Sequence, residues 1–182
     1  MTLFEEKTIA TEKIFEGKVI DLQVDTVKLP NGHESKRELV KHPGAVAVIA
    51  VTDEDKLVLV KQFRKPLEKT ILEIPAGKID PGEEPIKTAA RELREETGYT
   101  AEGLSLVTSF YTSPGFADEI IYLYEATGLI KGDAQPDDDE FVEIEEVDLN
   151  VAATYMADQT IHDAKTAYAV MYLQLKQARN QS

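Results

Sequence analysis

Residues 77–99, GKIDPGEEPIKTAARELREETGY, constrain this chain more than any other segment. Pro85 suits the first position of a helix, where its missing N–H costs nothing. Gly98 suits the position just past the last turn, where the backbone often turns left-handed. The sequence therefore predicts a helix from about Pro85 to Thr97.

The predicted helix has two chemically different sides. Glu92, Glu95 and Glu96 share one side. Arg91 precedes Glu95 by four positions, a spacing at which the two residues can form an ion pair. At roughly 100° per residue, the apolar side chains gather on another side, which we expect to pack into a core: Ile86, Ala89, Ala90 and Leu93.

The acidic side admits two interpretations. Glu92 and Glu96 repel each other, and negative charge in the last turn opposes the helix dipole by about 0.3–1 kcal/mol per residue. A solvated acidic face tolerates such charge and is common. A bound divalent cation accounts for the charge better, because hard cations such as Mg²⁺ prefer oxygen ligands and clustered carboxylates supply them.

The segment resembles the Nudix box, G-x5-E-x7-R-E-U-x-E-E-x-G-U, where U is a bulky aliphatic residue. Tyr99 departs from the pattern in the final U position, although it is bulky and apolar. The other fixed positions are filled at the required spacing by Gly77, Glu83, Arg91, Glu92, Leu93, Glu95, Glu96 and Gly98. The resemblance implies an α/β fold, an α/β/α sandwich with a mixed sheet, and an enzyme that hydrolyses a diphosphate linked to a nucleoside.

Composition argues against several other classes of protein. The chain has 20 Lys and Arg against 34 Asp and Glu, a net charge of −14, which disfavours a nucleic-acid or membrane-surface partner. It has no cysteine, and therefore no disulfide, thiol nucleophile or zinc–thiolate site. No apolar run approaches the length of a membrane span, and the first residues lack the pattern of a secretory signal. We therefore expect a cytoplasmic protein.

Apolar runs and turn residues predict further elements. They predict strands at 45–51, 57–63, 71–74, 104–110, 120–125 and 141–147. They also predict a closing helix over 164–178, with a packed side formed by Ala167, Val170, Met171 and Leu175. Two helices can cover opposite faces of a sheet, which agrees with the implied sandwich.

We expect residues 1–42 to form a small N-terminal β sub-domain and residues 43–182 to form the domain that resembles the Nudix family. Residues 19–29 alternate, residues 30–33 give a turn signal, and residues 34–40 can return as the partner strand. A unit of two strands is only marginally stable alone, so we expect it to dock on something. In enzymes that the chain resembles, this sub-domain is exchanged between protomers, which implies a homodimer.

The resemblance also implies metal ligands. Glu92 and Glu96 are the first candidates for direct ligands of Mg²⁺, with Mn²⁺ as an alternative ion. The carbonyl of Ala76, just before the box glycine, is a further ligand carried over from the family. Glu95 belongs to the catalytic group, either as another ligand or as a support that Arg91 holds. Such a metal would neutralise the diphosphate and orient the attacking water.

An acidic loop at residues 136–140 offers candidates for the catalytic base. One interpretation is a solvated loop without a specific role. In the ADP-ribose pyrophosphatases that the chain resembles, however, the base lies on a loop at this place. Asp137 is the candidate base, Glu140 is its rival, and Asp139 is a candidate metal ligand. The family commonly has Glu here, whereas Asp is shorter.

Two further features resemble the ADP-ribose pyrophosphatase subgroup. Pro114 lies sixteen residues beyond Gly98, within the run Ser113-Pro114-Gly115-Phe116, which on its own is also typical of an ordinary turn. We expect Pro114, Gly115 and Phe116 to contact the substrate, with Phe116 stacking on adenine or simply packing. Arg64 falls where the subgroup places an arginine that contacts phosphate; the alternative is a surface arginine. Arg37 is a weaker candidate for contact with phosphate or ribose.

These features together predict Mg²⁺-dependent hydrolysis of ADP-ribose to AMP and ribose 5-phosphate. One alternative is a Nudix pyrophosphatase for another nucleoside diphosphate sugar or for a dinucleotide. Another is a catalytically inactive module that binds ADP-ribose, and a third is a protein that only stores divalent cations. The full set of box carboxylates disfavours the inactive module.

Overall fold

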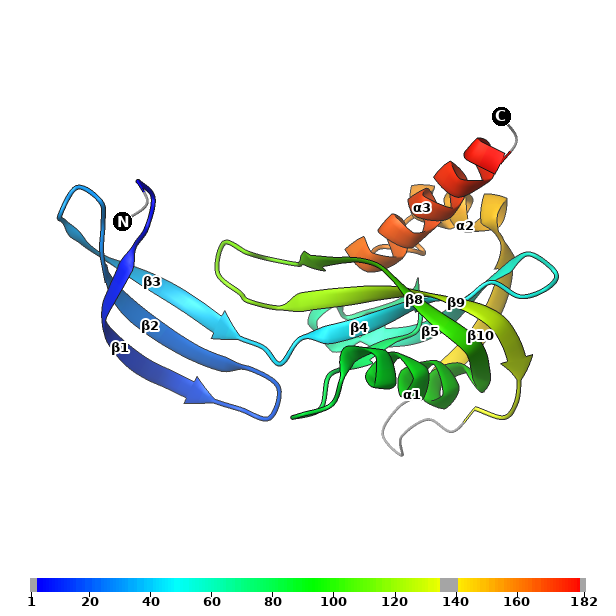
Figure 1. Ribbon diagram of the computed structural model, residues 1–182, viewed down its shortest axis with the longest axis horizontal. Coiled ribbons are helices and arrows are strands. Elements are labelled where there is room, and N and C mark those ends of the chain that lie inside the picture. Colours follow the sequence, from blue (N-terminus) through cyan, green and yellow to red (C-terminus); the bar gives the residue numbers. More distant parts are fainter. Residues whose placement is uncertain (1–2, 135–140, 181–182) are drawn as a thin grey trace. The chain divides into compact units, whose positions relative to one another are not determined.

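The computed structural model describes residues 3–134 and 141–180 (Figure 1). Its backbone contacts divide the chain into two compact units. The first unit comprises Met1–Gly44 and Phe110–Ile120, and the second comprises Ala45–Ser109 and Ile121–Ser182. Within the described ranges, no helix combines the length and apolar character that crossing a bilayer requires.

An antiparallel sheet forms the first unit, with strands β1 (Lys7–Glu16), β2 (Asp21–Lys28) and β3 (Glu34–Lys41) in that order. The predicted pair of strands around the 30–33 turn is confirmed, but the expectation of only two strands is wrong. β1 escaped prediction because its register shifts twice, between Thr8 and Ala10 and between Lys13 and Phe15. Such bulges break the alternation of side chains that identifies a strand.

The second part of this unit, Phe110–Ile120, is held by the end of β3. The N–H of Val40 donates to the carbonyl of Phe116 at 2.8 Å, and the N–H of Asp118 donates to the carbonyl of Val40 at 3.2 Å. The carboxylate of Asp118 pairs with Lys41 at 2.8 Å. The Pro-Gly turn at residues 114–115 is therefore tied by backbone and side chain to the small sheet.

The second unit contains two sheets. One has the order β7-β4-β9-β8 and the other β10-β5-β6. β4 pairs in parallel with β9 and antiparallel with β7, so this sheet is mixed. The strands are β4 (Ala45–Ile49), β5 (Lys56–Arg64), β6 (Lys69–Glu73), β7 (Ala76–Lys78), β8 (Tyr99–Tyr111), β9 (Ile120–Lys131) and β10 (Val142–Asp148), with a short 3-10 turn at Lys65–Leu67.

Helices cover both sides of these sheets, which confirms the α/β sandwich. α1 (Pro85–Thr97) lies on one side and contacts β4, β7, β5 and β10. α2 (Leu149–Ala157) and α3 (Ala164–Asn180) pack together on the other side (Figure 1). α1 and α3 were predicted, whereas α2 was not. The sequence of α2, LNVAATYMA, is short and apolar almost throughout, so it lacks the contrast between an apolar and a polar face that identifies a helix.

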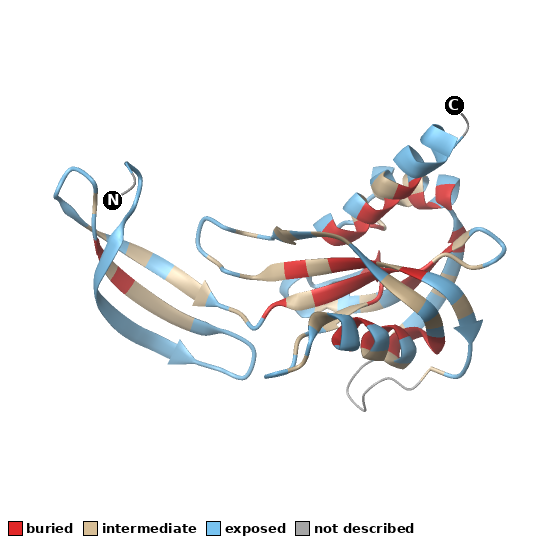
Figure 2. Ribbon diagram, in the orientation of Figure 1, coloured by how far each residue is buried: buried red, intermediate tan, exposed pale blue. Residues whose placement is uncertain are grey.

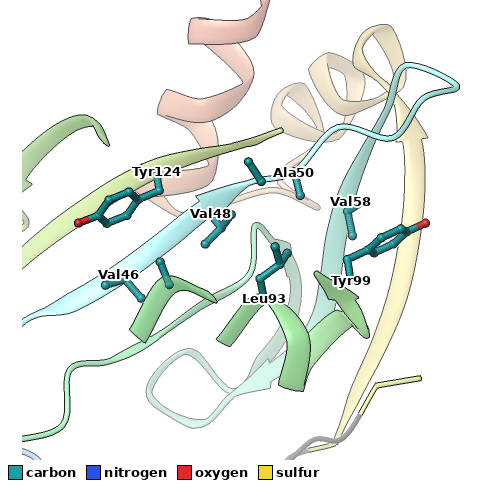
Figure 3. Close-up of a cluster of buried hydrophobic side chains, with 9 residues drawn as sticks. Val46, Val48, Ala50, Val58, Leu93, Tyr99 and Tyr124 are labelled. Atoms are coloured by element: carbon teal, nitrogen blue, oxygen red, sulfur yellow. The ribbon is translucent and has the colours of Figure 1, made fainter. Parts of the chain in front are cut away.

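The core of this unit is built where α1 meets the sheet (Figure 3). Leu93 and Ala89 are fully buried there. They pack with the other buried members of one cluster, Val46, Val48, Ala50, Val58, Tyr99, Tyr124 and Ala126. The predicted strand 45–51 is thus confirmed as a buried strand that receives the apolar side of the box helix.

The predicted apolar faces are only partly correct (Figure 2). Ile86 is 44% exposed and Ala90 is exposed, whereas Glu92 and Glu96 lie on the buried side of α1. In α3, Val170 is buried, but Met171 and Leu175 are more than half exposed. The buried side of α3 instead contains Lys165, Thr166, Ala169, Val170 and Leu173. Both helices therefore bury charged or polar groups that an apolar pattern would place in solvent.

Candidate active site

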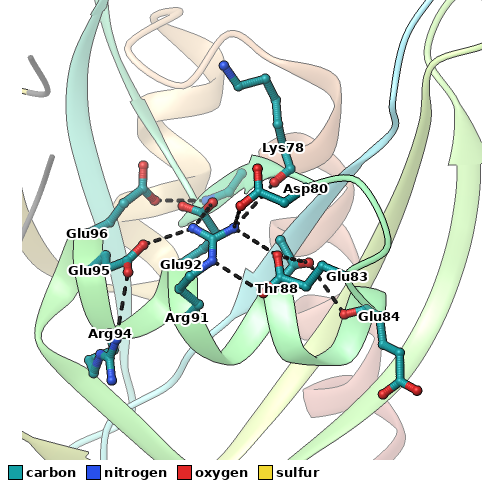
Figure 4. A network of polar contacts seen from close by, with 11 residues as sticks. Lys78, Asp80, Glu83, Glu84, Thr88, Arg91, Glu92, Arg94, Glu95 and Glu96 are labelled. Carbon is teal, nitrogen blue, oxygen red and sulfur yellow. Dashed lines mark hydrogen bonds and ion pairs between the residues drawn. The ribbon is translucent and has the colours of Figure 1, made fainter. Parts of the chain in front are cut away.

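Arg91 lies at the centre of the acidic side of α1 (Figure 4). Its Nη1 donates to Oε1 of Glu92 at 2.8 Å and to Oε2 of Glu95 at 2.9 Å, which confirms the predicted pair four positions apart. Its Nη2 and Nε donate to the carboxylate of Glu83 at 3.2 and 3.4 Å. The hydroxyl of Thr88 donates to the same carboxylate at 2.9 Å. One guanidinium thus gathers three box carboxylates.

The charges in this network are mutually stabilised. Burial alone would lower the pKa of Arg91, but its hydrogen bonds with Glu83 and Glu95 and the charge of Glu92 raise the pKa well above its usual value. The hydrogen bond from Arg91, followed by that from Thr88, lowers the pKa of Glu83. Arg91 and Glu83 therefore stay ionised around neutral pH.

The segment before α1 approaches the box carboxylates closely. Gly77 lies against Glu92, and a Cβ at position 77 would come within 2.0 Å of Oε1 of that carboxylate. The N–H of Ala76 donates to Oε2 of Glu96 at 2.9 Å. Glu92 and Glu96 are only 8% and 2% exposed. β7, a strand that was not predicted, therefore fixes the position of the Nudix glycine relative to two nearly buried acids.

The donor chemistry of this site fits a hard divalent cation. Glu92 and Glu96 are nearly buried one helical turn apart, and carboxylate oxygens are the ligands that Mg²⁺ and similar ions prefer. The glycine at position 77 lets the backbone lie directly against the Glu92 carboxylate, where a Cβ would clash. Across residues 3–134 and 141–180, no three acidic or histidine side chains are already arranged around a common ion position. The carboxylates instead contact Arg91 and the N–H of Ala76.

Arg64 comes from the end of β5 and reaches a buried carboxylate. Its Nε donates to Oε2 of Glu73 at 2.5 Å, and its side chain is 38% exposed. Burial alone would lower the pKa of Arg64, but Glu73 and, more weakly, Glu96 raise it. Arg64 is thus neither a free surface arginine nor a fully buried one. Its contact with phosphate stays a prediction.

Sequence reasoning missed Glu73 and its second partner, Lys165 of α3. A signal was present in the segment Ile71-Leu72-Glu73-Ile74, where one acid interrupts an apolar strand. A carboxylate buried in such a strand needs a cation or hydrogen-bond donors. The identity of that cation was not visible, because Lys165 lies 92 positions away.

The other predicted substrate contacts lie in the first unit. Arg37 donates from Nε and Nη2 to the carboxylate of Glu6 at 2.8 and 2.6 Å. Pro114, Gly115 and Phe116 form an exposed turn, closed by the N–H of Phe116 donating to the carbonyl of Ser113 at 3.1 Å. Phe116 is 55% exposed and therefore not a core residue. The predicted residues Asp137, Asp139 and Glu140 lie outside the described part of the chain.

Two residues after α1 hold the described ends of the β9–β10 connection. The N–H of Gly132 donates to the carbonyl of Gly98 at 3.0 Å. The hydroxyl of Tyr99 donates to Glu146 of β10 at 2.7 Å, and Lys131 donates to the same carboxylate oxygen at 2.7 Å. Tyr99, the departure from the Nudix pattern, thus combines a buried ring with a polar contact that an aliphatic residue cannot make.

Comparison with known proteins agrees with this geometry. Residues 41–169 match the NUDIX domain family, and residues 6–40 match the family described as nucleoside diphosphate sugar hydrolase N-terminal domain. An ADP-ribose pyrophosphatase of Bacillus subtilis (strain 168) is 62% identical over 98% of this chain and 97% of its own length. A methanol dehydrogenase activator of Bacillus methanolicus is 61% identical over 97% of this chain and 96% of its own.

A solved structure described as an ADP compounds hydrolase has the same fold. It covers 100% of this chain and 98% of its own, with a TM-score of 0.84 and 21% sequence identity. The family match covers the box helix, both sheets of the second unit, α2 and the start of α3, up to residue 169. The chain therefore belongs to the Nudix family of hydrolases, whose members generally need a divalent metal ion.

Proposed function

We propose that this protein hydrolyses the diphosphate bond of ADP-ribose to AMP and ribose 5-phosphate, with Mg²⁺ as the metal ion. The observation that carries the reaction type is the grouping of the four box carboxylates: Glu83, Glu92 and Glu95 bind Arg91, and Glu96, one turn beyond Glu92, accepts from the N–H of Ala76. The substrate is inferred from the Bacillus subtilis relative, which is named ADP-ribose pyrophosphatase and aligns with nearly the whole chain.

The residues of the site have separate tasks in this proposal. Glu92, Glu96 and the carbonyl of Ala76 would hold the metal, which when bound neutralises the diphosphate and orients the attacking water. Arg91 keeps Glu83 and Glu95 in place. These supports matter because ligands are effective only when their own positions are fixed.

The chemical step needs a base and an anchor for the phosphate. A carboxylate of the 136–140 loop, Asp137 or its rival Glu140, accepts a proton from water, and Asp139 assists as a ligand. The water oxygen forms a bond to one phosphorus, and the bridging P–O bond breaks to release the two monophosphates. Arg64 contacts a phosphate and stabilises its developing charge. Arg37, Pro114, Gly115 and Phe116 contact the rest of the nucleotide.

We also propose that residues 1–42 form a sub-domain that pairs two copies of the chain, and that the protein is cytoplasmic. β1 supports the pairing, because its apolar residues Ile9, Ile14 and Phe15 are about half exposed. Exposed apolar side chains on one strand are typical of a surface that another chain covers. Light scattering after size exclusion should give twice the 20.2 kDa mass of the chain; a monomer at micromolar concentration would contradict the proposal.

A panel of diphosphates tests the proposed reaction. Purified protein is incubated with ADP-ribose, UDP-glucose, a diadenosine polyphosphate or NAD, and products are separated by ion-exchange chromatography. We expect the highest kcat/KM with ADP-ribose, dependence on Mg²⁺ and loss of activity with EDTA. Glu96→Gln, which preserves the size of the side chain, should abolish turnover. If another compound is turned over equally well or better, that compound and not ADP-ribose would be assigned as the substrate. The Nudix box is compatible with this alternative.

A second candidate function follows from the Bacillus methanolicus relative, named methanol dehydrogenase activator, at 61% identity. To test this candidate, the same preparation is added to a methanol dehydrogenase. Faster oxidation of methanol with wild-type protein, but not with Glu96→Gln, would show activation that needs the box. An unchanged rate in both cases would leave ADP-ribose hydrolysis as the function.

A further inference from the structure

A cluster of buried charges lies behind Arg64, formed by β5, β6 and the start of α3. Glu73 is 3% exposed, and its two carboxylate oxygens are divided between two cations. Oε2 accepts from Nε of Arg64 at 2.5 Å, and Oε1 accepts from the ammonium of Lys165. Lys165, 8% exposed, also donates to Oδ1 of Asp163 at 2.9 Å. Buried charges are stable in such an arrangement because each is paired.

The start of α3 holds Lys165 in place on both sides. Oδ1 of Asp163 accepts from the N–H of Thr166 at 3.1 Å, as expected for a residue that caps a helix. The hydroxyl of Thr166 accepts from the N–H of Ile74 at 3.0 Å, one residue beyond Glu73. α3 and the end of β6 are therefore joined by a backbone contact beside the charge pair, which limits how far Lys165 can move.

Because each oxygen of Glu73 binds a different cation, Glu73 engages only one nitrogen of the Arg64 guanidinium. Among the residues that the structure describes, Arg64 donates a hydrogen bond from Nε alone. Its side chain is 38% exposed, and it is close enough to Glu96 of the box helix to be influenced by that charge. The terminal Nη1 and Nη2 groups form a fork that matches the oxygens of a phosphate.

Lys165 determines how Glu73 can bind Arg64. Without the ammonium, both oxygens of a buried carboxylate would be open to the one remaining cation. Arginine and a carboxylate then favour a bidentate pair, in which two guanidinium nitrogens donate in parallel. Such a pair would engage an Nη group and draw the side chain towards Glu73, away from solvent.

We propose that Lys165 is a positioning residue for phosphate binding: it occupies one oxygen of Glu73, restricts Arg64 to a contact through Nε, and leaves Nη1 and Nη2 for a phosphate of the substrate. The inference rests on the proposed function, in which Arg64 contacts the diphosphate. Lys165 itself does not touch the substrate, because its ammonium is engaged by Glu73 and Asp163.

A double-mutant cycle on KM tests the inference. In wild type, Lys165→Met should raise the KM for ADP-ribose roughly three- to tenfold, with a smaller change in kcat. Arg64→Ala should raise KM roughly ten- to a hundredfold, since it removes a charged hydrogen-bond donor. In the Arg64→Ala background, Lys165→Met should leave KM unchanged. Lys165→Arg, which keeps a cation beside Glu73, should restore most of the affinity.

Controls separate positioning from stability. Thr166→Val breaks the contact between α3 and Ile74 without removing charge, and should lower Tm while leaving KM unchanged. If Lys165→Met does not fold, Glu73→Gln takes its place, because it weakens the hold on Arg64 at constant size. It too should raise KM only when Arg64 is present.

The outcomes separate this inference from the proposed function. Equal increases in KM with and without Arg64, or a lower Tm with unchanged KM, would overturn the role of Lys165 in an enzyme that still hydrolyses ADP-ribose. An unchanged KM in Arg64→Ala would also overturn it, because Arg64 would then not contact the substrate. Wild-type protein that hydrolyses no diphosphate in the panel would overturn the proposed function, and the inference with it.

Discussion

Gly77 lies directly against the carboxylate of Glu92. A Cβ at position 77 would come within 1.9 Å of Cδ and 2.0 Å of Oε1 of that residue. The glycine that opens the Nudix box is therefore required for close approach between β7 and α1. Since Glu92 is a proposed metal ligand, the missing side chain at position 77 sets where that ligand can lie.

Replacing Gly77 with alanine should abolish hydrolysis with a smaller effect on stability. The new methyl group displaces Glu92, and an error of about 1 Å in a catalytic group can cost roughly a hundredfold in rate. We expect kcat to fall by at least that factor in an ADP-ribose assay. Gly103→Ala is the control, because its Cβ would approach only the hydroxyl of Thr127. Near-normal kcat in Gly77→Ala would show that the close approach is not needed.

Lysine cannot replace Arg91. The guanidinium donates from three nitrogens to Glu83, Glu92 and Glu95, whereas an ammonium is a single point on a flexible chain. Arg91→Lys should lower the free energy of unfolding by about 1–3 kcal/mol, measured in urea, and should also reduce kcat. Arg94→Lys, in the next turn and 54% exposed, should change neither. Equal stability of the two variants would argue that the network contributes little.

The Glu83–Arg91 contact should make stability depend on pH in the acid range. The folded-state pKa of Glu83 lies below the usual 4.5, mainly because of its hydrogen bond from Arg91. Its contribution is therefore fully present above about pH 4.5 and is lost as pH falls through the lower folded value. The Tm of wild type and of Glu83→Gln is measured from about pH 7 to 3. The amount by which the Tm of wild type exceeds that of the variant should decrease as the pH falls. A stability advantage of wild type that is already lost above about pH 4.5 would contradict the lowered pKa.

The sequence predicted those parts of the molecule that have local signals. α1 was found because Pro85 and Gly98 mark its two ends, and Gly98 has the expected left-handed backbone with φ of +74°. β1 was missed because its bulges break the alternation of side chains, and α2 was missed because it is short and apolar almost throughout, without a distinct polar face. The prediction of which side of α1 is buried was partly wrong, because Glu92 and Glu96 are buried although they are not hydrophobic.

The site was predictable only where its residues share a short segment. The pair between Arg91 and Glu95 follows from a spacing of four on one helix and is confirmed at 2.9 Å. The contact between Glu73 and Lys165 joins a strand to the last helix across 92 positions. No periodicity in the sequence predicts such a contact, because the contact depends on how the helices pack against the sheets.

Alanine at position 98 should destabilise the protein in two ways. The left-handed φ of +74° disfavours any residue with a Cβ, and that Cβ would lie 2.6 Å from both the N–H nitrogen of Ala134 and the carbonyl oxygen of Gly132. Gly82→Ala is a matched control, because Gly82 has φ of +83° with nothing within 4 Å. We expect about 1 kcal/mol of destabilisation for Gly82→Ala and about 2–4 kcal/mol for Gly98→Ala in urea unfolding. Equal values would show that the 132–134 segment moves away at little cost.

The hydroxyl of Tyr99 should stabilise the protein through Glu146. It donates to Oε1 at 2.7 Å, and the ammonium of Lys131 shares that oxygen at 2.7 Å. Tyr99→Phe keeps the buried ring and should lower the free energy of unfolding by about 0.5–1.5 kcal/mol, because it removes only the hydrogen bond. Tyr122→Phe is the control, since the hydroxyl of Tyr122 has no hydrogen bond within the described part of the chain.

The interaction energy between the hydroxyl of Tyr99 and the carboxylate of Glu146 can be measured by combining Tyr99→Phe with Glu146→Gln. Lys131, and then Tyr99, lower the pKa of Glu146, so the carboxylate is ionised and accepts from both residues at neutral pH. Because the two side chains are in contact, their effects should be less than additive, with a coupling of at least about 0.5 kcal/mol. Two outcomes would contradict this role of the hydroxyl: fully additive losses of stability, or a loss in Tyr99→Phe no larger than in Tyr122→Phe. Either result would mean that the ring of Tyr99, and not its hydroxyl, accounts for the tyrosine at this position of the Nudix box.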